Sequence, residues 1–289
     1  MNIYDIARLA GVSYATVSRV INHKDDVKQE TRERVQKILD EYDYLPNSFA
    51  RGLAKNGMKI IGIIVIDVRN IHHINTAFFV EKEFSKYGYT SIIVGCGMDY
   101  TKQEEYLRVM AGHNVDGLVL IGSRFQNDTT KKILLKYFSG KPVVIANGYI
   151  DIPKVCGVVV QEKEAVVDAV TRLYNEGHRN FAFFNDYVTF SAQEKEEGFK
   201  KGLKIHDISF NEKNIRHIQT DMNMGEQETM RLLKLDNTIT AILYSEDIMA
   251  VGGVKACHHL HLRIPQDISI VGFNNSIYSD ISLPRKTLL

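Results

Sequence analysis

From Ile60 onward the chain alternates short apolar runs with longer amphipathic stretches, and this alternation limits its possible folds more than any other feature. Apolar runs of this length, bounded by turn residues, are typical of strands buried in a parallel sheet. Stretches such as "TAFFVEKEFSKYG" and "TKQEEYLRVMAGH" have helical spacing and separate the runs. The runs fall into two sets: "KIIGIIVI", "TSIIVGCG", "VDGLVLIG" and "KPVVIANG", then "CGVVVQ", "RNFAFFND", "IRHIQT", "TAILYS" and "DISIVGF".

Strands that alternate with helices twice over predict an α/β core of two doubly wound parallel-sheet subdomains. We place this core at residues 59–289, with the first subdomain at about 59–157 and the second at about 158–283. Ligands of such folds bind at the carboxyl ends of the strands. We therefore expect a ligand cleft at those ends and between the two halves.

Residues 1–46 have a different pattern, with three short helical periodicities. Gly11 provides a turn after the first of them, and Ser13 is a good N-cap for the second helix. This arrangement is typical of an all-α helix-turn-helix bundle. The three apolar stripes are Ile3, Ile6, Ala7 and Ala10; Val17, Val20 and Ile21; and Val35, Ile38, Leu39 and Tyr42. The second helix presents on its opposite face Tyr14, Ala15, Ser18, Arg19 and Asn22.

The segment 47–58 joins these two parts and lies in "YLPNSFARGLAKNGMK". Asn47 can cap a helix there and Gly57 can end it. Such a helix would be shorter than the ~12–15 residues at which isolated helices become marginal in water. Gly52 lowers its helix propensity by a further ~1 kcal/mol. We expect this segment to fold only when another molecule holds it.

Composition excludes little by itself. The 36 Lys and Arg residues nearly match the 35 Asp and Glu residues, so nucleic-acid binding must be argued from motifs rather than from bulk charge. Three widely spaced cysteines, Cys96, Cys156 and Cys257, fit a reducing compartment better than a disulfide framework. The N-terminus has no signal-peptide pattern, and no 18-residue apolar run occurs. We expect a cytoplasmic protein with no membrane segment.

The order of these parts resembles the LacI/GalR family of bacterial transcriptional regulators along essentially the whole chain. Its most specific motifs are "YDIARLAGVSYATVSRVIN" and "NSFARGLAK", and "GHRNFAFF", "MAVGGVKA" and "IPQDISIVGFNN" support it through the core. The resemblance implies a sequence-specific DNA-binding regulator, a repressor by default, whose affinity for its operator is controlled by a small effector.

The resemblance also implies which residues contact DNA. The second helix would enter the major groove and present Tyr14, Ala15 and Arg19 to base edges. Arg19 could donate two hydrogen bonds to guanine, while Ala15 offers only methyl contact. Phosphate contacts would come from four short polar side chains, those of Ser13, Thr16, Ser18 and Asn22. The alternative is a helical hairpin that only packs on the core.

In the family the joining segment becomes helical on the operator, and its leucine inserts into the minor groove. Leu53 matches that leucine, and Ala54 beside it allows close approach. Asn47, Ala50 and Arg51 would lie along the groove and the phosphates. The alternative is a plain linker.

A pseudo-palindromic operator requires two such units, so the resemblance implies a homodimer. The stretch 77–87 carries apolar residues around more than one helical stripe, so one sheet face cannot bury them all. In the family this helix lies at the subunit interface. An unusually deep core helix is equally compatible with the sequence.

The cleft of such a regulator binds a small effector, and the family's pattern places six residues in it: His72, His73, Ser123, Lys195, Asp247 and Asn274. Three positions depart from that pattern. Asn70 to His73 replace a common Asn-Pro-Phe-Phe, Lys195 replaces an arginine, and Asn274 replaces an aspartate. Lysine lacks the planar fork of arginine. With Arg124 nearby, two hypotheses remain open: an anionic ligand such as a sugar phosphate, or a neutral sugar.

The chain ends at "ISLPRKTLL", whereas family members continue with a return into the first subdomain. Leu283, Pro284 and Thr287 match the start of that return. We expect the rest of it to be missing and part of the first sheet to be uncovered, and an exposed sheet edge invites association.

Other classes of protein fit less well. Gly95-Cys96-Gly97 follows a strand but lacks the third glycine of a dinucleotide site, and no nucleophile or P-loop motif appears, so we expect neither an enzyme nor a cofactor. Adjacent His258 and His259 would diverge on a helix, so a metal site is not expected. The main alternative is a sugar-binding protein of the periplasmic type without a DNA function.

Overall fold

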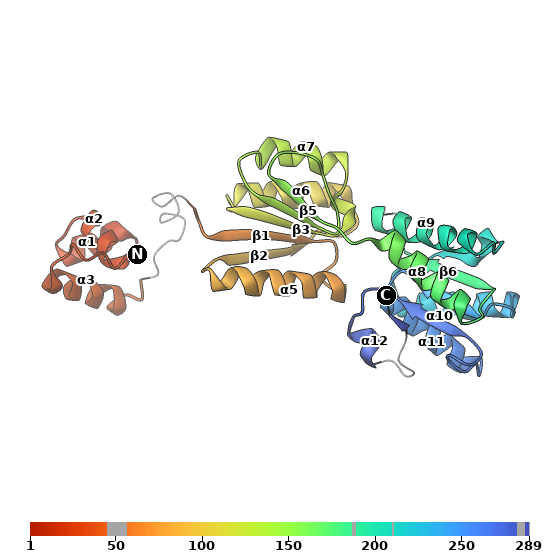
Figure 1. The fold of residues 1–289 in the computed structure, drawn as a ribbon. Helices are drawn as coiled ribbons and strands as arrows, with labels where there is room; N and C mark the ends of the chain where they lie inside the picture. Colours follow the sequence, from red (N-terminus) through yellow and green to blue (C-terminus); the bar gives the residue numbers. More distant parts are fainter. Residues whose placement is uncertain (45–56, 187–188, 210, 282–286, 289) are drawn as a thin grey trace. The chain divides into compact units, whose positions relative to one another are not determined.

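The computed structural model describes residues 1–44, 57–186, 189–209, 211–281 and 287–288 (Figure 1). The chain divides into two compact units, Met1–Lys59 and Ile60–Leu289. We call them the helical unit and the α/β unit.

The helical unit contains α1 (Ile3–Ala10), α2 (Tyr14–Ile21) and α3 (Gln29–Glu41). Asn2 caps α1, because its side chain accepts hydrogen bonds from the amides of Tyr4 and Asp5 and its own amide donates to the Asp5 carboxylate. Gly11 ends α1 in a left-handed conformation with φ 63°, which glycine adopts without strain. The three predicted apolar stripes meet in one core that contains Ile6, Ala7, Ala10, Val17, Val20, Val35 and Leu39.

One residue of the predicted apolar stripes, Tyr42, is not buried. Tyr42 is 45% exposed, because α3 ends at Glu41 and Tyr42 is its C-terminal cap. The chain turns there, and the amide of Tyr44 donates to the carbonyl of Leu39 at 2.9 Å. Tyr44 therefore packs against the core in place of Tyr42.

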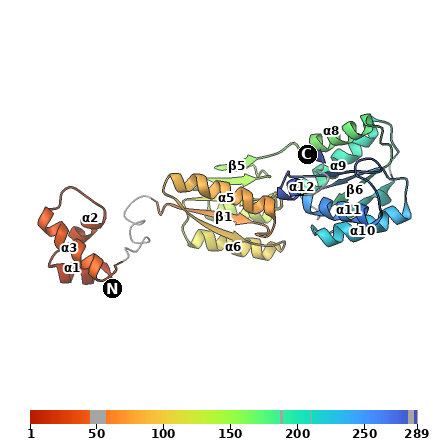
Figure 2. The ribbon, with the colours of Figure 1, turned by 90° about the horizontal axis from the view of Figure 1, so that it is seen from below.

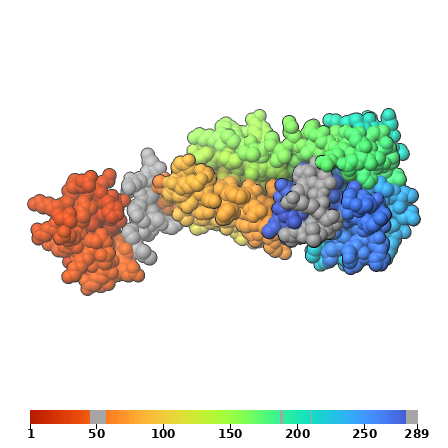
Figure 3. Space-filling view, turned by 60° about the horizontal axis from the view of Figure 1, so that its bottom comes forward, coloured from red at the N-terminus to blue at the C-terminus, as the bar shows by residue number. Residues whose placement is uncertain are grey.

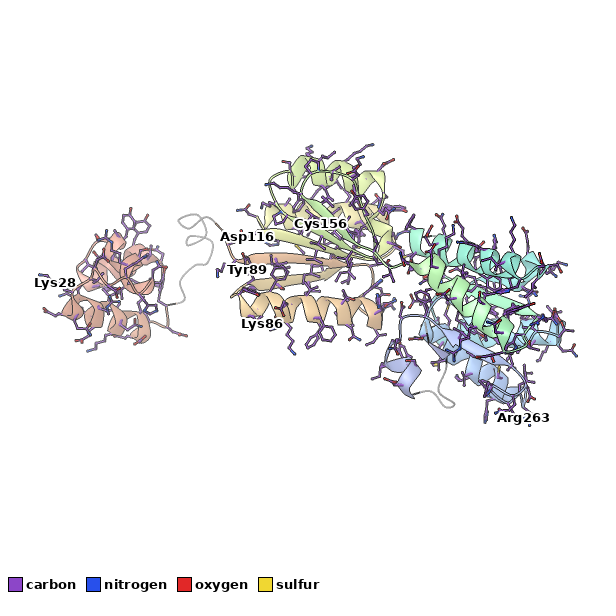
Figure 4. The ribbon with its side chains drawn as sticks, viewed as in Figure 1. Lys28, Lys86, Tyr89, Asp116, Cys156 and Arg263 are labelled. Atoms are coloured by element: carbon purple, nitrogen blue, oxygen red, sulfur yellow. The ribbon has the colours of Figure 1, made fainter. Side chains whose placement is uncertain are left out.

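The α/β unit has two lobes, each built on one parallel sheet. The sheet of the first lobe has the order β2-β1-β3-β4-β5, with strands β1 (Ile60–Val65), β2 (Thr90–Gly95), β3 (Gly117–Ile121), β4 (Val143–Ala146) and β5 (Val155–Val158). Its helices are α5 (Ile71–Lys86), α6 (Tyr100–Gly112), the short η1 (Ser123–Phe125) and α7 (Asp128–Tyr137). The amide of Ile60 donates to the carboxylate of Asp116 at 3.2 Å, which joins the starts of β1 and β3 (Figure 4).

Helices cover both faces of this sheet (Figures 1 and 2). In β1 the side chains of Ile61, Ile63 and Val65 pack toward α5, whereas Ile64 packs toward α6 and α7. A strand that is apolar on both faces appears in the sequence as an unbroken run of apolar residues. This explains why the strands of the sequence lack apolar-polar alternation.

The second lobe repeats this plan with the sheet order β10-β9-β8-β6-β7. Its strands are β6 (Phe181–Asn185), β7 (Ile215–His217), β8 (Ala241–Tyr244), β9 (Ser269–Gly272) and β10 (Thr287–Leu288). Its helices are α8 (Glu162–Asn175), α9 (Phe190–Ile205), η2 (Glu212–Asn214), α10 (Met222–Leu235), α11 (Asp247–His259) and α12 (Ile277–Ile281). The α8–α9 pair packs on one sheet face and the α10–α11 pair on the other. The predicted pair of parallel-sheet subdomains is confirmed.

Three details of the prediction are wrong. The run "CGVVVQ", assigned to the second set, instead contributes to β5, which pairs with β4 in the first sheet. The runs that form β2, β5 and β7 were expected to be buried, but these strands lie at sheet edges and are only partly buried. Thr287, expected at the start of a return into the first lobe, instead belongs to β10, which pairs with β9 in the second sheet. Sheet order is set by contacts between distant segments, so none of these features can be read from local patterns.

The surface of α5 is apolar over part of its length. Ala77 is buried against the sheet, whereas Phe78 and Phe79 are more than half exposed. The rings of these two phenylalanines pack edge to face, with their centroids 5.4 Å apart. Tyr87, just after the helix, is also exposed. In the space-filling view α5 forms part of the surface, coloured orange (Figure 3). The interpretation of α5 as a deep core helix is therefore wrong.

Candidate nucleic-acid interface and ligand cavity

The outward face of α2 presents the side chains predicted to contact DNA. Ser13 caps the helix, as predicted, because its hydroxyl oxygen accepts the amide of Thr16 at 3.2 Å. Val17 and Val20 point into the core. Tyr14, Ala15 and Arg19 are exposed on the opposite side. The turn and the cap thus fix which face of α2 is free.

The remaining predicted residues of α2 have partners within the helix. Thr16, Ser18 and Asn22 are half-buried. The Asn22 amide nitrogen donates to the Ser18 carbonyl at 2.7 Å, which closes the end of the helix. Hydroxyl and amide groups held in this way can still offer a hydrogen bond to a phosphate oxygen.

Arg19 is only weakly held. Its Nε lies 3.5 Å from an Asp26 carboxylate oxygen, and both side chains are more than half exposed. Such a pair contributes about 0–1 kcal/mol, so the guanidinium is available to another partner.

The sequence analysis missed Tyr4. This residue of α1 is exposed, and the centroid of its ring lies 5.6 Å from the centroid of the Tyr14 ring. The two rings form one aromatic patch, and Tyr14 belongs to the same helix as Arg19. This patch can pack against sugar or base edges. A signal was present, because Tyr4 lies outside the apolar stripe of α1. The five predicted residues of the joining segment, Asn47, Ala50, Arg51, Leu53 and Ala54, lie outside the described residues.

A cavity of about 560 Å³ lies in the α/β unit at the carboxyl ends of strands from both sheets. It brings together all six residues that the sequence placed in the cleft: His72, His73, Ser123, Lys195, Asp247 and Asn274. Arg124 also lines it. Sequence reasoning missed Asn147, Asp186, Ser191 and Glu246, which line the same cavity.

The first-lobe wall is built from backbone turns after β1 and β3. Asn70 caps α5, and its side-chain oxygen accepts the amides of His72 and His73 at 2.9 and 3.2 Å. Gly122 has φ 123°, and a Cβ there would lie 2.9 Å from Ile66, so only glycine fits. These turns hold both imidazoles and Ser123 at the cavity.

Both histidines are uncharged near pH 7. Burial, together with the neighbouring His72, lowers the pKa of His73 to about 4. Burial and the charge of Lys195 also lower the pKa of His72. Arg124 is engaged elsewhere, since its guanidinium donates to the Met98 carbonyl at 2.5 Å and lies 4.2 Å from the centre of the Tyr100 ring. The first-lobe wall is therefore polar, and its cation Arg124 is bound to partners within its own lobe.

Lys195 is the buried cation of the site, with 3% of its surface exposed. Its ammonium donates to the Ser245 carbonyl at 3.1 Å and lies 4.1 Å from the centre of the Phe273 ring. It is also 3.5 Å from Oε1 of buried Glu162. A buried charge requires such partners, because its removal from water costs several kcal/mol.

Glu162 joins the two lobes at the base of the cavity. Its Oε1 accepts the Ser191 hydroxyl at 2.6 Å and the Asn147 side-chain amide at 3.4 Å. The Ser191 amide in turn donates to the Ser123 hydroxyl oxygen at 3.2 Å. Asn147 and Ser123 belong to the first lobe, whereas Glu162 and Ser191 belong to the second. No local sequence signal indicates Glu162, because it is the first residue of an ordinary helix.

The second-lobe wall carries four carboxyl groups, and one of them, that of Asp221, caps α10. Asp247 accepts the amide and the hydroxyl of Ser276 at 2.6 and 2.7 Å. Glu246 accepts the Asn274 side-chain amide at 2.7 Å, and burial raises the pKa of Glu246 to about 8. Burial also raises the pKa of Asp186. This wall can accept hydrogen bonds from hydroxyl or ammonium groups.

Two kinds of feature are absent from the described residues. Among the residues that the structure describes, no group of three or more His, Cys, Asp or Glu side chains is arranged to hold a metal ion. Within the same part of the chain, no helix has the length and apolar character that crossing a membrane requires.

In comparisons with known proteins, the helical unit and the α/β unit each match a family model. Residues 2–47 match the family model of bacterial regulatory proteins of the lacI family, and residues 170–288 match that of periplasmic binding protein-like domains. An HTH-type transcriptional regulator of Lachnoclostridium phytofermentans is 32% identical over 99% of this chain and 87% of its own length. Catabolite control protein A of Priestia megaterium is 30% identical over 99% of this chain and 86% of its own length.

Solved structures show the same fold. The Lac repressor dimer bound to its operator and the anti-inducer ONPF superposes with a TM-score of 0.86, at 23% identity, over 100% of this chain and 86% of that chain. A complex of the transcriptional regulator CelR with cellobiose has a TM-score of 0.70, at 23% identity, over 100% of this chain and 87% of that chain.

Proposed function

Because the chain belongs to the lacI family of bacterial regulatory proteins, and is thus a DNA-binding transcriptional regulator, we propose that it acts as a repressor that binds a pseudo-palindromic operator as a homodimer. A small carbohydrate-like effector in the cavity controls this binding. The observation that carries the proposal is the outward face of α2, which presents Tyr14, Ala15 and Arg19 from a packed three-helix core. A bacterial protein that binds genomic DNA acts in the cytoplasm.

Arg19 is the residue that reads base edges in this proposal. We would select binding sites from a random DNA library and then compare Arg19→Ala with Arg34→Ala, which removes the same charge from an exposed position on α3. A bidentate contact to guanine contributes ~1–3 kcal/mol, so Arg19→Ala should weaken binding roughly 5- to 150-fold and relax the preference at one base pair. Equal losses in both variants would indicate attraction by charge alone.

The joining segment contributes the second DNA contact, an argument that rests on its sequence. Leu53 is proposed to insert between base pairs in the minor groove. Leu53→Ala should weaken binding to the selected site while leaving non-specific binding to random DNA unchanged. If both fall together, the segment has no role in recognition.

The homodimer is proposed to form through α5. Phe79 is 65% exposed there beside Phe78, and burial of such rings in an interface would stabilise the pair. Phe79→Lys should convert the dimer to a monomer in sedimentation equilibrium. Leu235→Lys on α10, a residue that is equally exposed and apolar, is the control and should leave the dimer intact.

The effector is proposed to bind in the cavity lined by the six predicted residues. Cellobiose in the CelR complex and ONPF in the Lac repressor complex support a sugar-like ligand. The geometry favours a ligand without a phosphate, because both histidines are uncharged and the ammonium of Lys195 is matched by Glu162. A phosphate would also face the carboxyl groups of the second-lobe wall.

A further inference from the structure

The proposed effector site has a charge imbalance that specifies its ligand more narrowly. We propose that the effector is a small polyhydroxy compound with one positively charged amine, held by Asp186 and Glu246. This inference rests on the proposed function, since it assumes that the cavity is the effector site, and it concerns only the chemistry of the ligand.

The two carboxyl groups lie side by side because of the sheet register. β6 and β8 are adjacent parallel strands, with Phe184 paired to Tyr244. Asp186 and Glu246 each follow two residues later, where the strands end at the cavity. Neighbouring strands are roughly 4.8 Å apart, so one ammonium group can reach both side chains. The Asp186 amide, which donates to the Ser245 hydroxyl at 3.0 Å, fixes this arrangement.

Two of the cations around the cavity are paired with carboxylates. Lys195 is paired with Glu162, and Arg69 at the rim is paired with Asp67 at 2.7 Å. Arg124 stacks on an aromatic ring of the first lobe. Among the described residues, no Lys, Arg or His forms an ion pair with Asp186 or Glu246. The cavity therefore has acidic groups in excess over cations on one wall.

Burial makes ionisation of these carboxyl groups unfavourable, and the positive charge of Lys195 offsets this only in part, so the pKa of Asp186 is raised and that of Glu246 is about 8. A ligand ammonium would supply the missing charge and lower both pKa values. A neutral hydroxyl can donate a hydrogen bond but cannot balance the charge of an ionised carboxylate, and a phosphate would oppose the ionisation of both groups.

Matched sugars provide the test. Glucose, galactose and mannose would each be compared by calorimetry at about pH 7 with the 2-amino sugar, in which an ammonium replaces one hydroxyl, and with the 6-phosphate. Because charge-assisted hydrogen bonds are about twice as strong as neutral ones, at least one amino sugar should bind roughly tenfold or more tightly than its parent. The corresponding 6-phosphate should bind more weakly than the parent.

Two variants and one further measurement separate charge from fit. Glu246→Gln should reduce the preference for the amino sugar to within about threefold, whereas Glu164→Gln, at an exposed position on α8, should retain it. Binding should release protons, because the pKa of Glu246 falls when an ammonium joins Lys195, Asp186, Asp247 and Asn274 around it. The heat of binding should then depend on the ionisation enthalpy of the buffer.

Tighter binding of the parent sugars or of the phosphates would contradict the proposal that the effector carries an amine. It would not contradict the proposed regulatory function. Absence of binding by all three amino sugars would also overturn it. Failure of the proposed function would be recognised separately, by the lack of any selected DNA site.

Discussion

The DNA-facing surface of α2 and the cavity of the α/β unit are built in opposite ways. The first uses residues 13–22, which one turn and one cap orient, and its Tyr14, Ala15 and Arg19 side chains are exposed. The second draws on turns after strands of two different sheets, and its central ion pair, Lys195 and Glu162, is buried. Substitutions on α2 should therefore change binding with little effect on folding. Substitutions in the cavity should change both together.

The largest effect tests whether the two units fold independently. Ile6 is fully buried in the core of the helical unit, and truncation of such a residue costs about 2–5 kcal/mol. Ile6→Ala should abolish DNA binding and remove the thermal transition of the helical unit. Calorimetry should show the transition of the α/β unit at its original temperature. A lower temperature for that transition would mean that the units stabilise each other.

Glu162→Gln should destabilise the α/β unit by about 3 kcal/mol, because it leaves the charge of Lys195 buried without its acidic partner. Denaturant unfolding would measure the loss. Glu164→Gln makes the same chemical change at an exposed position two residues away and should have almost no effect. Similar losses in both variants would show that the ion pair contributes nothing beyond the helix.

Glu246→Gln should change how stability depends on pH. The pKa of Glu246 is about 8 in the folded state, compared with a reference value of 4.5, with Lys195, Asp186, Asp247 and Asn274 around it. Between these values the folded carboxyl keeps a proton that the unfolded one has lost, so its contribution to stability falls as pH rises from about 4.5 to 8. Glutamine cannot ionise and should remove this dependence.

The variant should therefore gain about 1–2 kcal/mol over the native chain at pH 8, with little gain at pH 5. Because 1 kcal/mol corresponds to roughly 2–4 °C in Tm for a unit of this size, the difference is measurable by thermal unfolding. An equal gain at both pH values would exclude ionisation as the cause.

The smallest effect concerns the cap of α2. Ser13→Ala removes the acceptor of the Thr16 amide and should cost about 1 kcal/mol in the stability of the helical unit. Ser13→Thr keeps a hydroxyl and should restore most of that stability. Circular dichroism during thermal unfolding would show the loss. If threonine fails to rescue, the hydroxyl is not acting as a cap.

Sequence patterns predicted the strands and the three N-terminal helices well, with errors at identifiable places. The burial of β2, β5 and β7 was overestimated, since an apolar run does not tell whether its strand lies at an edge. Tyr42 was misplaced because a periodic pattern does not show where the helix stops. The six cleft residues followed from the family resemblance rather than from any local pattern.

Asp186 and Glu246 could have been found by one rule. Each lies two residues after the end of an apolar run, and polar residues at the carboxyl ends of parallel strands face the ligand site of such folds. Glu162 could not have been found in this way. Its importance depends on Lys195, Asn147 and Ser191, which lie on other elements.

The sequence by itself determined the elements of this protein and the face that α2 presents, because caps, turns and helical spacing act between residues a few positions apart. Only the tertiary structure decided which strands became edges and which charges met in the cavity. The reason is that those properties depend on distances between segments far apart in the chain, and the free energy of a buried carboxyl depends on whether a partner from such a segment arrives beside it.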